Sequence, residues 1–303
     1  MEWSGRNDGS DELNLRLFQK VKLSQNYQDL QKGNFVLHGF AVDEGVRRNK
    51  GRIGAAQAPD LIRKGMANFP IHTAFEIYDF GNISCEDKDL ETSQEHLAIS
   101  VAKGFAQGAK SIVLGGGHEL TFAHFSGIRK AFPGKRIGIV NFDAHFDNRI
   151  PEDKQASSGT GFWQIAHTDA LQSLHIGIQR NSNTSKLFHI AHQLGMQYIL
   201  ADELFYENLS ALFRRIDTFL EEIEVLYITI CMDVFNASIA PGVSAPAYNG
   251  IFADPCFLAL YRYLLAQEKL QALDVAEVNP EYDIQDRTAR LAAALVNEWL
   301  MIK

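Results

Sequence analysis

The chain has little positive charge, few cysteines and no long apolar segment. Its 303 residues include 29 lysines and arginines against 37 aspartates and glutamates, so the formal net charge is -8. This balance argues against nucleic acid or an anionic membrane as a partner. An anionic small-molecule substrate would have to be bound by local arginines.

Membrane insertion, secretion and disulfide stabilisation have no support in the sequence. No apolar stretch approaches the roughly 18 residues that cross a bilayer. The N-terminal segment shows neither the basic region nor the apolar core of a secretory signal. Three cysteines, Cys85, Cys231 and Cys256, are too few and too scattered for a disulfide framework. We therefore expect a cytoplasmic protein.

Short apolar runs alternate along the chain with longer amphipathic segments. The runs predict strands at 34–38, 75–79, 111–115, 137–142, 173–178, 197–200, 225–232 and 271–276. The amphipathic segments predict helices near 57–66, 91–107, 119–131, 184–194, 203–222, 254–267 and 285–301. Strands that are apolar throughout are typical of a parallel sheet covered by helices on both faces, which predicts an α/β fold. Without repeats or linkers, residues 1–303 are expected to form one domain, with a partly flexible extension at 1–33.

The segment 141–147 reads Asn-Phe-Asp-Ala-His-Phe-Asp and follows an apolar run at 137–140. In an extended chain, Asp143, His145 and Asp147 would lie on one face. Two carboxylates and an imidazole at the end of a buried strand repel one another unless a cation lies among them. This spacing predicts a divalent metal site.

Three other predicted strands also end at residues that can bind a metal ion or a substrate. His118 follows three glycines. Cys231 and Asp233 lie at the end of the strand predicted at 225–232. Glu277 follows the strand predicted at 271–276. Ligands in open parallel sheets bind at the carboxyl ends of the strands, and the long loops predicted at 39–54, 147–162 and 234–253 emerge there.

Each of these residues also has a simpler interpretation. The glycines can serve only to open a helix, Cys231 can be a small buried hydrophobe, and Glu277 can be a solvated acid at the start of a loop. His124, on the following helix, is interpreted as structural or surface-exposed.

Taken together, the strand ends offer imidazoles and more carboxylates than one tetrahedral zinc ion needs. Hard oxygen ligands with imidazoles suit Mn²⁺. The excess of carboxylates favours a pair of ions held about 3.5–4 Å apart.

The segments 115–119 (GGGHE), 143–147 (DAHFD), 231–242 (CMDVFNASIAPG) and 274–280 (DVAEVNP) resemble the ureohydrolase family of arginases, agmatinases and formimidoylglutamases. The resemblance extends from about residue 34 to the C-terminus. It implies a three-layer α/β/α sandwich on a parallel sheet of about eight strands. It also implies two Mn²⁺ ions, hydrolysis of a C–N bond in an amidine or guanidine, and a homo-oligomer.

The resemblance also assigns roles to individual residues. Asp143 would bridge the ions, with one ion on His118 and Asp147 and the other on His145 and Asp233. Glu277 would bind the amidine nitrogens. Cys231 stands where the family has a second bridging aspartate. A thiolate is a softer ligand, which leaves the identity and number of the metal ions open.

Substrate choice rests on the loops. Arg149, two positions after Asp147, would repel an ammonium group and pair with a carboxylate. The segments 43–52, 157–163 and 177–181 resemble the formimidoylglutamase pattern. From this resemblance we expect Ser158 and Arg180 to bind substrate along with Arg149, with Arg180 as a second contact to carboxylate.

The expected reaction is therefore hydrolysis of N-formimidoyl-L-glutamate, an anionic amidine, to L-glutamate and formamide by hydroxide attack on the amidine carbon. Without a histidine at 157–163, the group that protonates the leaving amine is unassigned. Three alternatives remain: an arginase or other guanidine or amidine hydrolase, a catalytically weakened binding protein on the same scaffold, and a purely surface role for Arg149.

Overall fold

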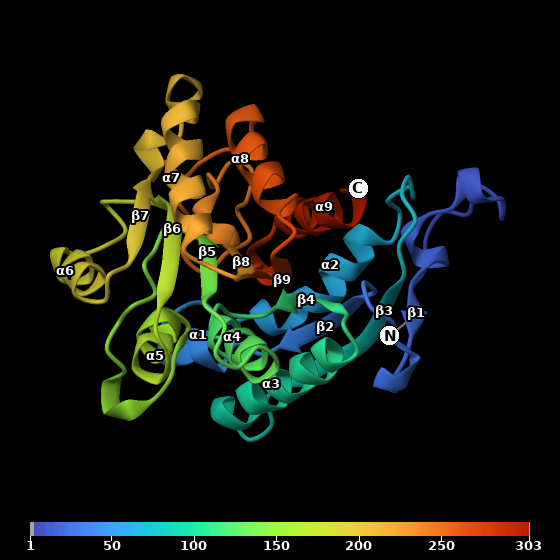
Figure 1. Ribbon diagram of the computed structural model, residues 1–303, viewed down its shortest axis with the longest axis horizontal. Coiled ribbons are helices and arrows are strands. Elements are labelled where there is room, and N and C mark those ends of the chain that lie inside the picture. Colours follow the sequence, from blue (N-terminus) through green and yellow to red (C-terminus); the bar gives the residue numbers. More distant parts are fainter. Residues whose placement is uncertain (1–2, 303) are drawn as a thin grey trace.

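One parallel sheet runs through the molecule. The computed structural model describes residues 3–302, and within them nine strands pair in the order β1-β3-β2-β4-β9-β8-β5-β6-β7 (Figure 1). Every strand pair is parallel. The carboxyl ends of all strands therefore lie along the same edge of the sheet.

The eight predicted strands are all present, and a ninth of two residues is added at one edge. The strands are β1 (Lys22–Leu23), β2 (Phe35–Ala41), β3 (Ile77–Ser84), β4 (Lys110–Gly115), β5 (Ile137–Phe142), β6 (Gln172–Ile178), β7 (Gln197–Leu200), β8 (Val225–Cys231) and β9 (Leu270–Ala276). The edge strand β1 is too short to leave a periodic pattern in the sequence.

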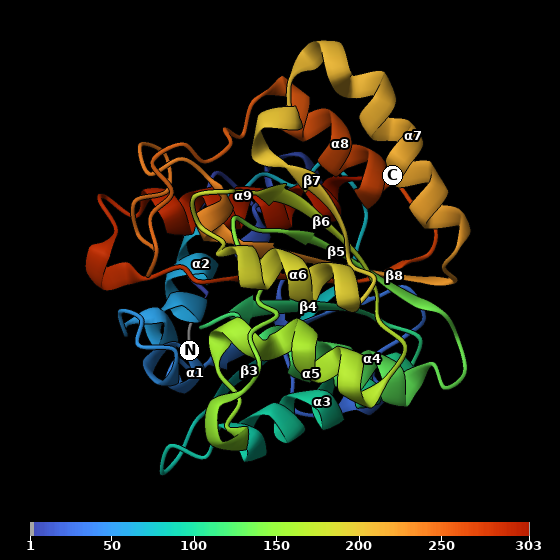
Figure 2. The same ribbon diagram turned by 90° about the vertical axis from the view of Figure 1, so that its left-hand side faces the viewer.

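Helices cover both faces of the sheet, as predicted (Figure 2). One face carries α2 (Ala58–Met66), α7 (Leu209–Glu221), α8 (Pro255–Leu265) and α9 (Arg287–Met301). The other carries α3 (Leu90–Ala106), α4 (Leu120–Ala131), α5 (Gly161–Thr168) and α6 (Ser185–Gln193). The result is the predicted three-layer α/β/α sandwich.

Two helices were not predicted. These are α1 (Glu44–Arg48), which lies in the predicted loop 39–54, and α5, whose first residue, Gly161, falls in the predicted loop 147–162. Helix α7 begins at Leu209 rather than near residue 203, because short 3-10 turns occupy the preceding residues. Short helices that pack on the rest of the fold leave weak sequence signals, because tertiary contacts stabilise them more than intrinsic propensity.

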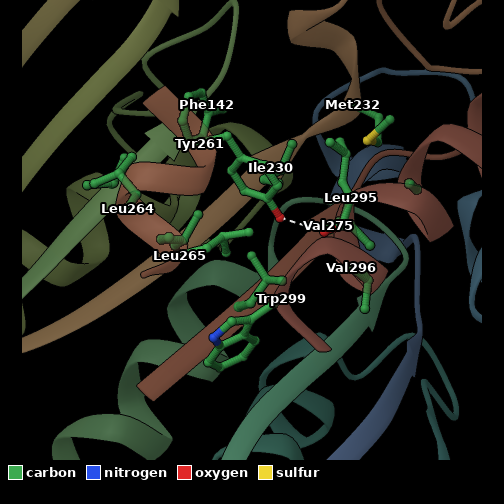
Figure 3. Packing of buried hydrophobic residues seen from close by; sticks show 14 of the residues in the cluster. Phe142, Ile230, Met232, Tyr261, Leu264, Leu265, Val275, Leu295, Val296 and Trp299 are labelled. Atoms are coloured by element: carbon green, nitrogen blue, oxygen red, sulfur yellow. Dashed lines mark hydrogen bonds between the residues drawn. The ribbon is translucent and has the colours of Figure 1, made fainter. Parts of the chain in front are cut away.

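The central strands have a different character on each face. On the side of α7–α9, Phe142, Ile230 and Val275 point into a continuous apolar core (Figure 3). On the side of α3–α6, polar residues alternate with apolar ones at the ends of β5, β8 and β9. Asn141 pairs in register with Thr229, and Thr229 with Asp274. All three are fully buried, so polar groups converge beneath this end of the sheet.

The first 33 residues pack against the sheet edge where they are described. The Trp3 indole donates to Asp79 over 2.8 Å, and Leu17 is fully buried. Among the helices of residues 3–302, none has the length and apolarity to cross a membrane.

Candidate metal centre

Four neighbouring strands deliver the candidate ligands to one place. The order β4-β9-β8-β5 puts their carboxyl ends side by side. His118 follows β4, Asp143 follows β5, Cys231 ends β8 and Glu277 follows β9. Residues far apart in the sequence therefore meet at the sheet edge where open α/β folds bind ligands.

The side chains form two groups that could each hold a metal ion. In the first group, ligand atoms of His118, Asp143 and Cys231 lie within 4.8 Å of one another. In the second, the same holds for Asp143, His145 and Asp233. Asp143 belongs to both groups, which is the arrangement that a carboxylate bridging two ions requires.

Asp147 joins the first group through His118. Its Oδ2 lies 2.8 Å from Nδ1 of His118, and Oδ2 of Asp143 lies 3.1 Å from the same nitrogen. The extended geometry predicted for this segment is wrong, because β5 ends at Phe142. Asp147 instead has a left-handed backbone with φ of 46°. The motif brings its side chains together as a turn beyond the strand.

The second acid of the third motif also lies in a turn. Strand β8 ends at Cys231, and residues Met232–Val234 form a 3-10 turn. Met232 is buried in the apolar core, while Asp233 Oδ2 lies 3.2 Å from Nδ1 of His145. The turn directs Cys231 and Asp233 to different ligand groups, although an extended strand would have put them on one face.

The electrostatics of the centre are dominated by buried acids. Burial alone lowers the pKa of His118, but hydrogen bonds to Asp143 and Asp147 outweigh it and raise the pKa well above 6.5. Burial likewise raises the pKa of Asp143, but its hydrogen bonds to His118 and His145 outweigh burial and lower the pKa. In these contacts, protonated imidazoles supply the positive charge that metal ions would supply.

For the Cys231 thiol and the Glu277 carboxyl, burial is not outweighed by hydrogen bonds. Burial raises the pKa of the Cys231 thiol well above 9.0, and the carboxylates around it raise it further. Burial also raises the pKa of Glu277 well above 4.5, reinforced by Glu119 and Asp233. Buried anions at this density need cations nearby.

The donor set fits divalent metal ions. Oδ1 of Asp233 is buried and has no hydrogen-bond partner among the described residues, so a lone pair is available to a ligand. Carboxylate oxygens and imidazole nitrogens are the donors that Mn²⁺ accepts, and one thiol adds a softer donor. Two metal ions held by these residues would supply the Lewis acidity that polarises a substrate and activates water.

The glycine turn before His118 brings backbone segments into close contact. Gly116 donates to Phe40 O over 2.9 Å, and a Cβ atom at Gly116 would lie 1.9 Å from Val42 O. Gly116 O accepts from the backbone N–H of Glu277, and His118 N–H donates to Oε1 of Glu277, at 2.8 and 2.9 Å. The turn thus fixes the carboxylate of Glu277 beside the ligands.

A cavity of about 320 Å³ opens over the ligands. It is lined by His145, Asp147, Cys231, Asp233 and Glu277 from the centre, and by Asn49, Lys50, Gly51, Arg52, Arg149, Ser158, Leu187, Ser244 and Ala245 around it. Arg149 and Ser158, which were predicted as substrate contacts, are among the lining residues. Arg180 is exposed and does not line this cavity.

Two further polar contacts support the centre. Thr229 Oγ1 lies 2.9 Å from Nε2 of His118, and Asn49 Nδ2 donates to Ser158 Oγ over 3.2 Å. Sequence reasoning missed Thr229, although its spacing of two residues from Cys231 on a strand was a usable signal.

His124 is structural: it is fully buried, and its Nδ1 lies 2.6 Å from Asp274 Oδ2.

Comparisons with known proteins agree with this geometry. The family model described as "Arginase family" matches residues 33–302. A formimidoylglutamase of Staphylococcus carnosus is 39% identical to the chain, over 98% of the chain and 97% of that protein. The crystal structure of formimidoylglutamase from Bacillus subtilis superposes with a TM-score of 0.87 at 20% identity, covering 99% of this chain and 95% of that one. A variant of Trypanosoma cruzi formiminoglutamase with Mn²⁺₂ superposes with a TM-score of 0.80 at 25% identity, covering 89% and 92%.

Proposed function

The chain belongs to the arginase family, and we propose that it hydrolyses N-formimidoyl-L-glutamate to L-glutamate and formamide. The observation that carries the proposal is the lining of the cavity over the ligands. Glu277, an acid, and Arg149, a cation, both line this cavity. An amidine that also bears a carboxylate matches this pair of charges. The formimidoylglutamase names of similar chains support the same choice.

The cofactor in this proposal is a pair of Mn²⁺ ions. The group of His118, Asp143 and Cys231, with Asp147 against His118, would hold one ion. The group of Asp143, His145 and Asp233 would hold the other. When bound, the ions supply Lewis acidity and lower the pKa of a water molecule, which gives a hydroxide nucleophile at neutral pH.

Glu277 would orient the reacting amidine. Its Oε1 accepts the backbone N–H of His118 at 2.9 Å, which leaves Oε2 for the nitrogens of the substrate. Its backbone is left-handed, with φ of 66°, and its side chain is almost fully buried. A buried carboxylate held in one orientation pairs strongly with a delocalised amidinium. The formimidoyl carbon is thereby positioned for attack.

Arg149 would bind a carboxylate of the substrate. Among the described residues, its guanidinium has no ion-pair partner, while its backbone N–H donates to Gly159 O over 2.9 Å and fixes the start of the side chain. A guanidinium binds a carboxylate through two parallel hydrogen bonds. Ser158, buried beside it and bonded to Asn49, would add a neutral hydrogen-bonding group. Arg180, which lies outside this cavity lining, has no place in the proposed substrate contacts.

A product assay tests the proposal. Protein loaded with Mn²⁺ is incubated with N-formimidoyl-L-glutamate or with L-arginine, and formamide, glutamate and urea are quantified, with metal counted per chain. We expect formamide and glutamate from the first substrate, no urea from the second, and two metal ions per chain. Glu277→Gln is the inactive control. Urea from arginine would instead assign an arginase activity, and hydrolysis of neither compound would favour a binding protein on this scaffold.

Two broader expectations stay predictions. A cytoplasmic location is tested by cell fractionation, and assembly into a homo-oligomer by light scattering of the purified protein.

A further inference from the structure

A second, larger cavity adjoins the one over the ligands. It has a volume of about 670 Å³, and its lining includes the cationic side chains of Arg47, Arg48, Lys50, Arg149 and Lys186. Four residues line both cavities: Asn49, Lys50, Arg149 and Leu187. A ligand that reaches from the ligand groups toward the outer cavity must pass these four residues. Two of them, Lys50 and Arg149, are cations.

Lys50 occupies a backbone conformation that lysine normally avoids. It follows helix α1 with a left-handed φ of 63°. Its N–H donates to Arg47 O at 3.0 Å, and Gly51 N–H donates to Val46 O at 2.9 Å, which closes the end of the helix. Glycine is the usual residue at such a position, because a side chain is disfavoured there. The turn itself therefore does not explain why this residue is a lysine.

The same conformation occurs at two candidate functional residues of the inner cavity. Eight non-glycine residues of the described chain have positive φ, and three of them line the inner cavity: Asp147, Glu277 and Lys50. Asp147 is a candidate metal ligand, and Glu277 is the candidate amidine-binding acid. Backbone strain of this kind concentrates at functional sites, where it aims a side chain. Lys50 fits that pattern.

The ammonium group of Lys50 is available to a ligand. Its nearest acid is Glu152, with Nζ 3.8 Å from Oε2, and both side chains are more than 80% exposed. A contact of that length between exposed groups is weak. The neighbouring arginines are engaged more closely: Arg47 and Arg48 pair with Glu44, at 2.5 and 3.0 Å.

Arg52, the remaining cation of the loop, is also occupied by the protein. Its Nε donates to Ser244 O at 2.9 Å, and its guanidinium lies over the ring of Tyr282. Among the cations of residues 47–52, Lys50 is thus the one without a close partner in the described chain.

We propose that Lys50 binds the second carboxylate of the substrate and so selects dicarboxylates over monocarboxylates. The proposal rests on the proposed function, in which Arg149 binds the first carboxylate. Lys50 and Arg149 would hold the two acidic ends while the amidine enters the ligand groups. A compact ammonium on a flexible stem reaches a mobile chain terminus more readily than a planar guanidinium does.

Substitution of Lys50 by asparagine tests this role. Asparagine tolerates the left-handed backbone but carries no charge. We expect Lys50→Asn to raise KM for N-formimidoyl-L-glutamate by about tenfold, the loss of one charge-assisted contact, with kcat within about threefold of the wild type. For the N-formimidoyl derivative of L-norvaline, which lacks the second carboxylate, the two enzymes are expected to have equal KM. An unchanged KM for the dicarboxylate, or an equal rise for both substrates, would overturn the proposal.

Two controls separate charge from backbone geometry. Lys186→Asn removes a cation that lines only the outer cavity and is expected to leave both KM values unchanged. Lys50→Gly relieves the strained conformation, so it is expected to raise Tm while weakening dicarboxylate binding as Lys50→Asn does. A purely structural Lys50 would give the Gly variant a normal KM.

Binding measurements keep the inference independent of turnover. If the wild type fails to hydrolyse the substrate, the proposed function fails, and Lys50 is then tested by calorimetry with L-glutamate. If L-glutamate binds about tenfold more weakly to Lys50→Asn than to the wild type, the role of Lys50 is supported. Equal binding to the two proteins, or no binding to either, rejects it.

Discussion

The Nε2 atom of His118 lies 2.9 Å from the hydroxyl oxygen of Thr229, on the opposite side of the imidazole ring from Asp143 and Asp147. The Nδ1 atom therefore faces the ligand group while the other nitrogen is held by β8. Histidine ligands are commonly oriented in this way by a hydrogen bond from their second ring nitrogen. Thr229 sits two residues before Cys231, so one strand supplies both a candidate ligand and the support for another.

Thr229→Val keeps the shape of the side chain and removes the acceptor for the His118 ring. We expect the affinity for Mn²⁺ to fall by about 10–100-fold, the usual loss for an outer contact of this type. Activity should recover at saturating metal, because no ligand has been removed. A calorimetric titration of the metal-free protein with Mn²⁺ measures the change in affinity.

Thr121→Val is the matched control. The Oγ1 atom of Thr121 lies 3.4 Å from that of Thr229 and is also buried, but it is one contact further from the ring. We expect its Mn²⁺ affinity to stay within about threefold of the wild type. If Thr229→Val also matched the wild type, packing rather than the hydroxyl would orient His118.

Cys231 is expected to be a working ligand of the first ion. The thiol is almost fully buried and belongs to the group of His118 and Asp143. We predict that Cys231→Ala lowers bound Mn²⁺ from two ions to about one per chain and reduces kcat at least 100-fold, a larger loss than that for an outer contact. Cys231→Asp should retain two ions, because a carboxylate is a better ligand for Mn²⁺. Elemental analysis after dialysis gives the count.

The other two cysteines provide the comparison for this experiment. Cys85 is partly buried and Cys256 is buried, and neither belongs to a ligand group of the described chain. Alanine at either position should leave the metal count and kcat unchanged. If Cys231→Asp were more active than the wild type, the thiol would instead mark a weakened site.

Arg149 is predicted to contribute substrate affinity rather than stability. Its side chain is exposed at the boundary of the two cavities. Arg149→Met should raise KM for N-formimidoyl-L-glutamate by about 10–100-fold and leave Tm within about 1 °C. Arg149→Lys should recover only part of the affinity, because an ammonium cannot make the paired hydrogen bonds of a guanidinium. Steady-state kinetics with all variants measures both effects.

Arg180→Met serves as the surface control for Arg149. Arg180 was predicted from sequence as a second carboxylate contact, but it does not line the cavity over the ligands. We expect wild-type KM for this variant. A KM as high as that of Arg149→Met would mean that Arg180 reaches the substrate after all.

The sheet could be predicted from sequence because its interior strands are apolar on both faces. Runs such as that at 225–230 have no polar face, so burial alone identifies them. The edge strand at 22–23 and the short helix at 44–48 could not be predicted, because each is stabilised mainly by contacts with the rest of the fold. Their positions matter, since the end of that helix sets the backbone of Lys50.

The spacing of the ligands predicted them as a set, but only the family resemblance predicted how they are grouped. Residues 143–147 form one sequence motif, whereas the contact of Asp147 with His118 depends on a left-handed backbone and on the order of the strands. Side chains of neighbouring strands meet only once that order is known. For the same reason, the assignment of Cys231 and Asp233 to separate groups follows from the turn after β8, which an extended-strand pattern does not contain.

A buried histidine outside the centre should make folding stability depend on pH. His38 on β2 is nearly fully buried, and its Nε2 lies 3.0 Å from Tyr27 Oη. Burial lowers the pKa of His38 from 6.5 to about 3. The unfolded chain therefore binds a proton below pH 6.5 that the folded chain does not. The contribution of His38 to the free energy of unfolding is fully present above pH 6.5 and is lost as the pH falls toward 3. The loss between pH 6.5 and 5 is about 2 kcal/mol.

His38→Leu removes this contribution and replaces the imidazole by an apolar side chain. Urea unfolding at pH 7.5 and pH 5.0, with EDTA present so that metal release does not contribute, gives the change in the free energy of unfolding for each protein. We expect the decrease for the variant to be about 2 kcal/mol smaller than for the wild type. His175, also buried with its pKa lowered to about 3, titrates equally in both proteins and cancels in the comparison. Equal decreases would show that His38 is protonated in the folded state, in which case its neighbours must accommodate a buried cation.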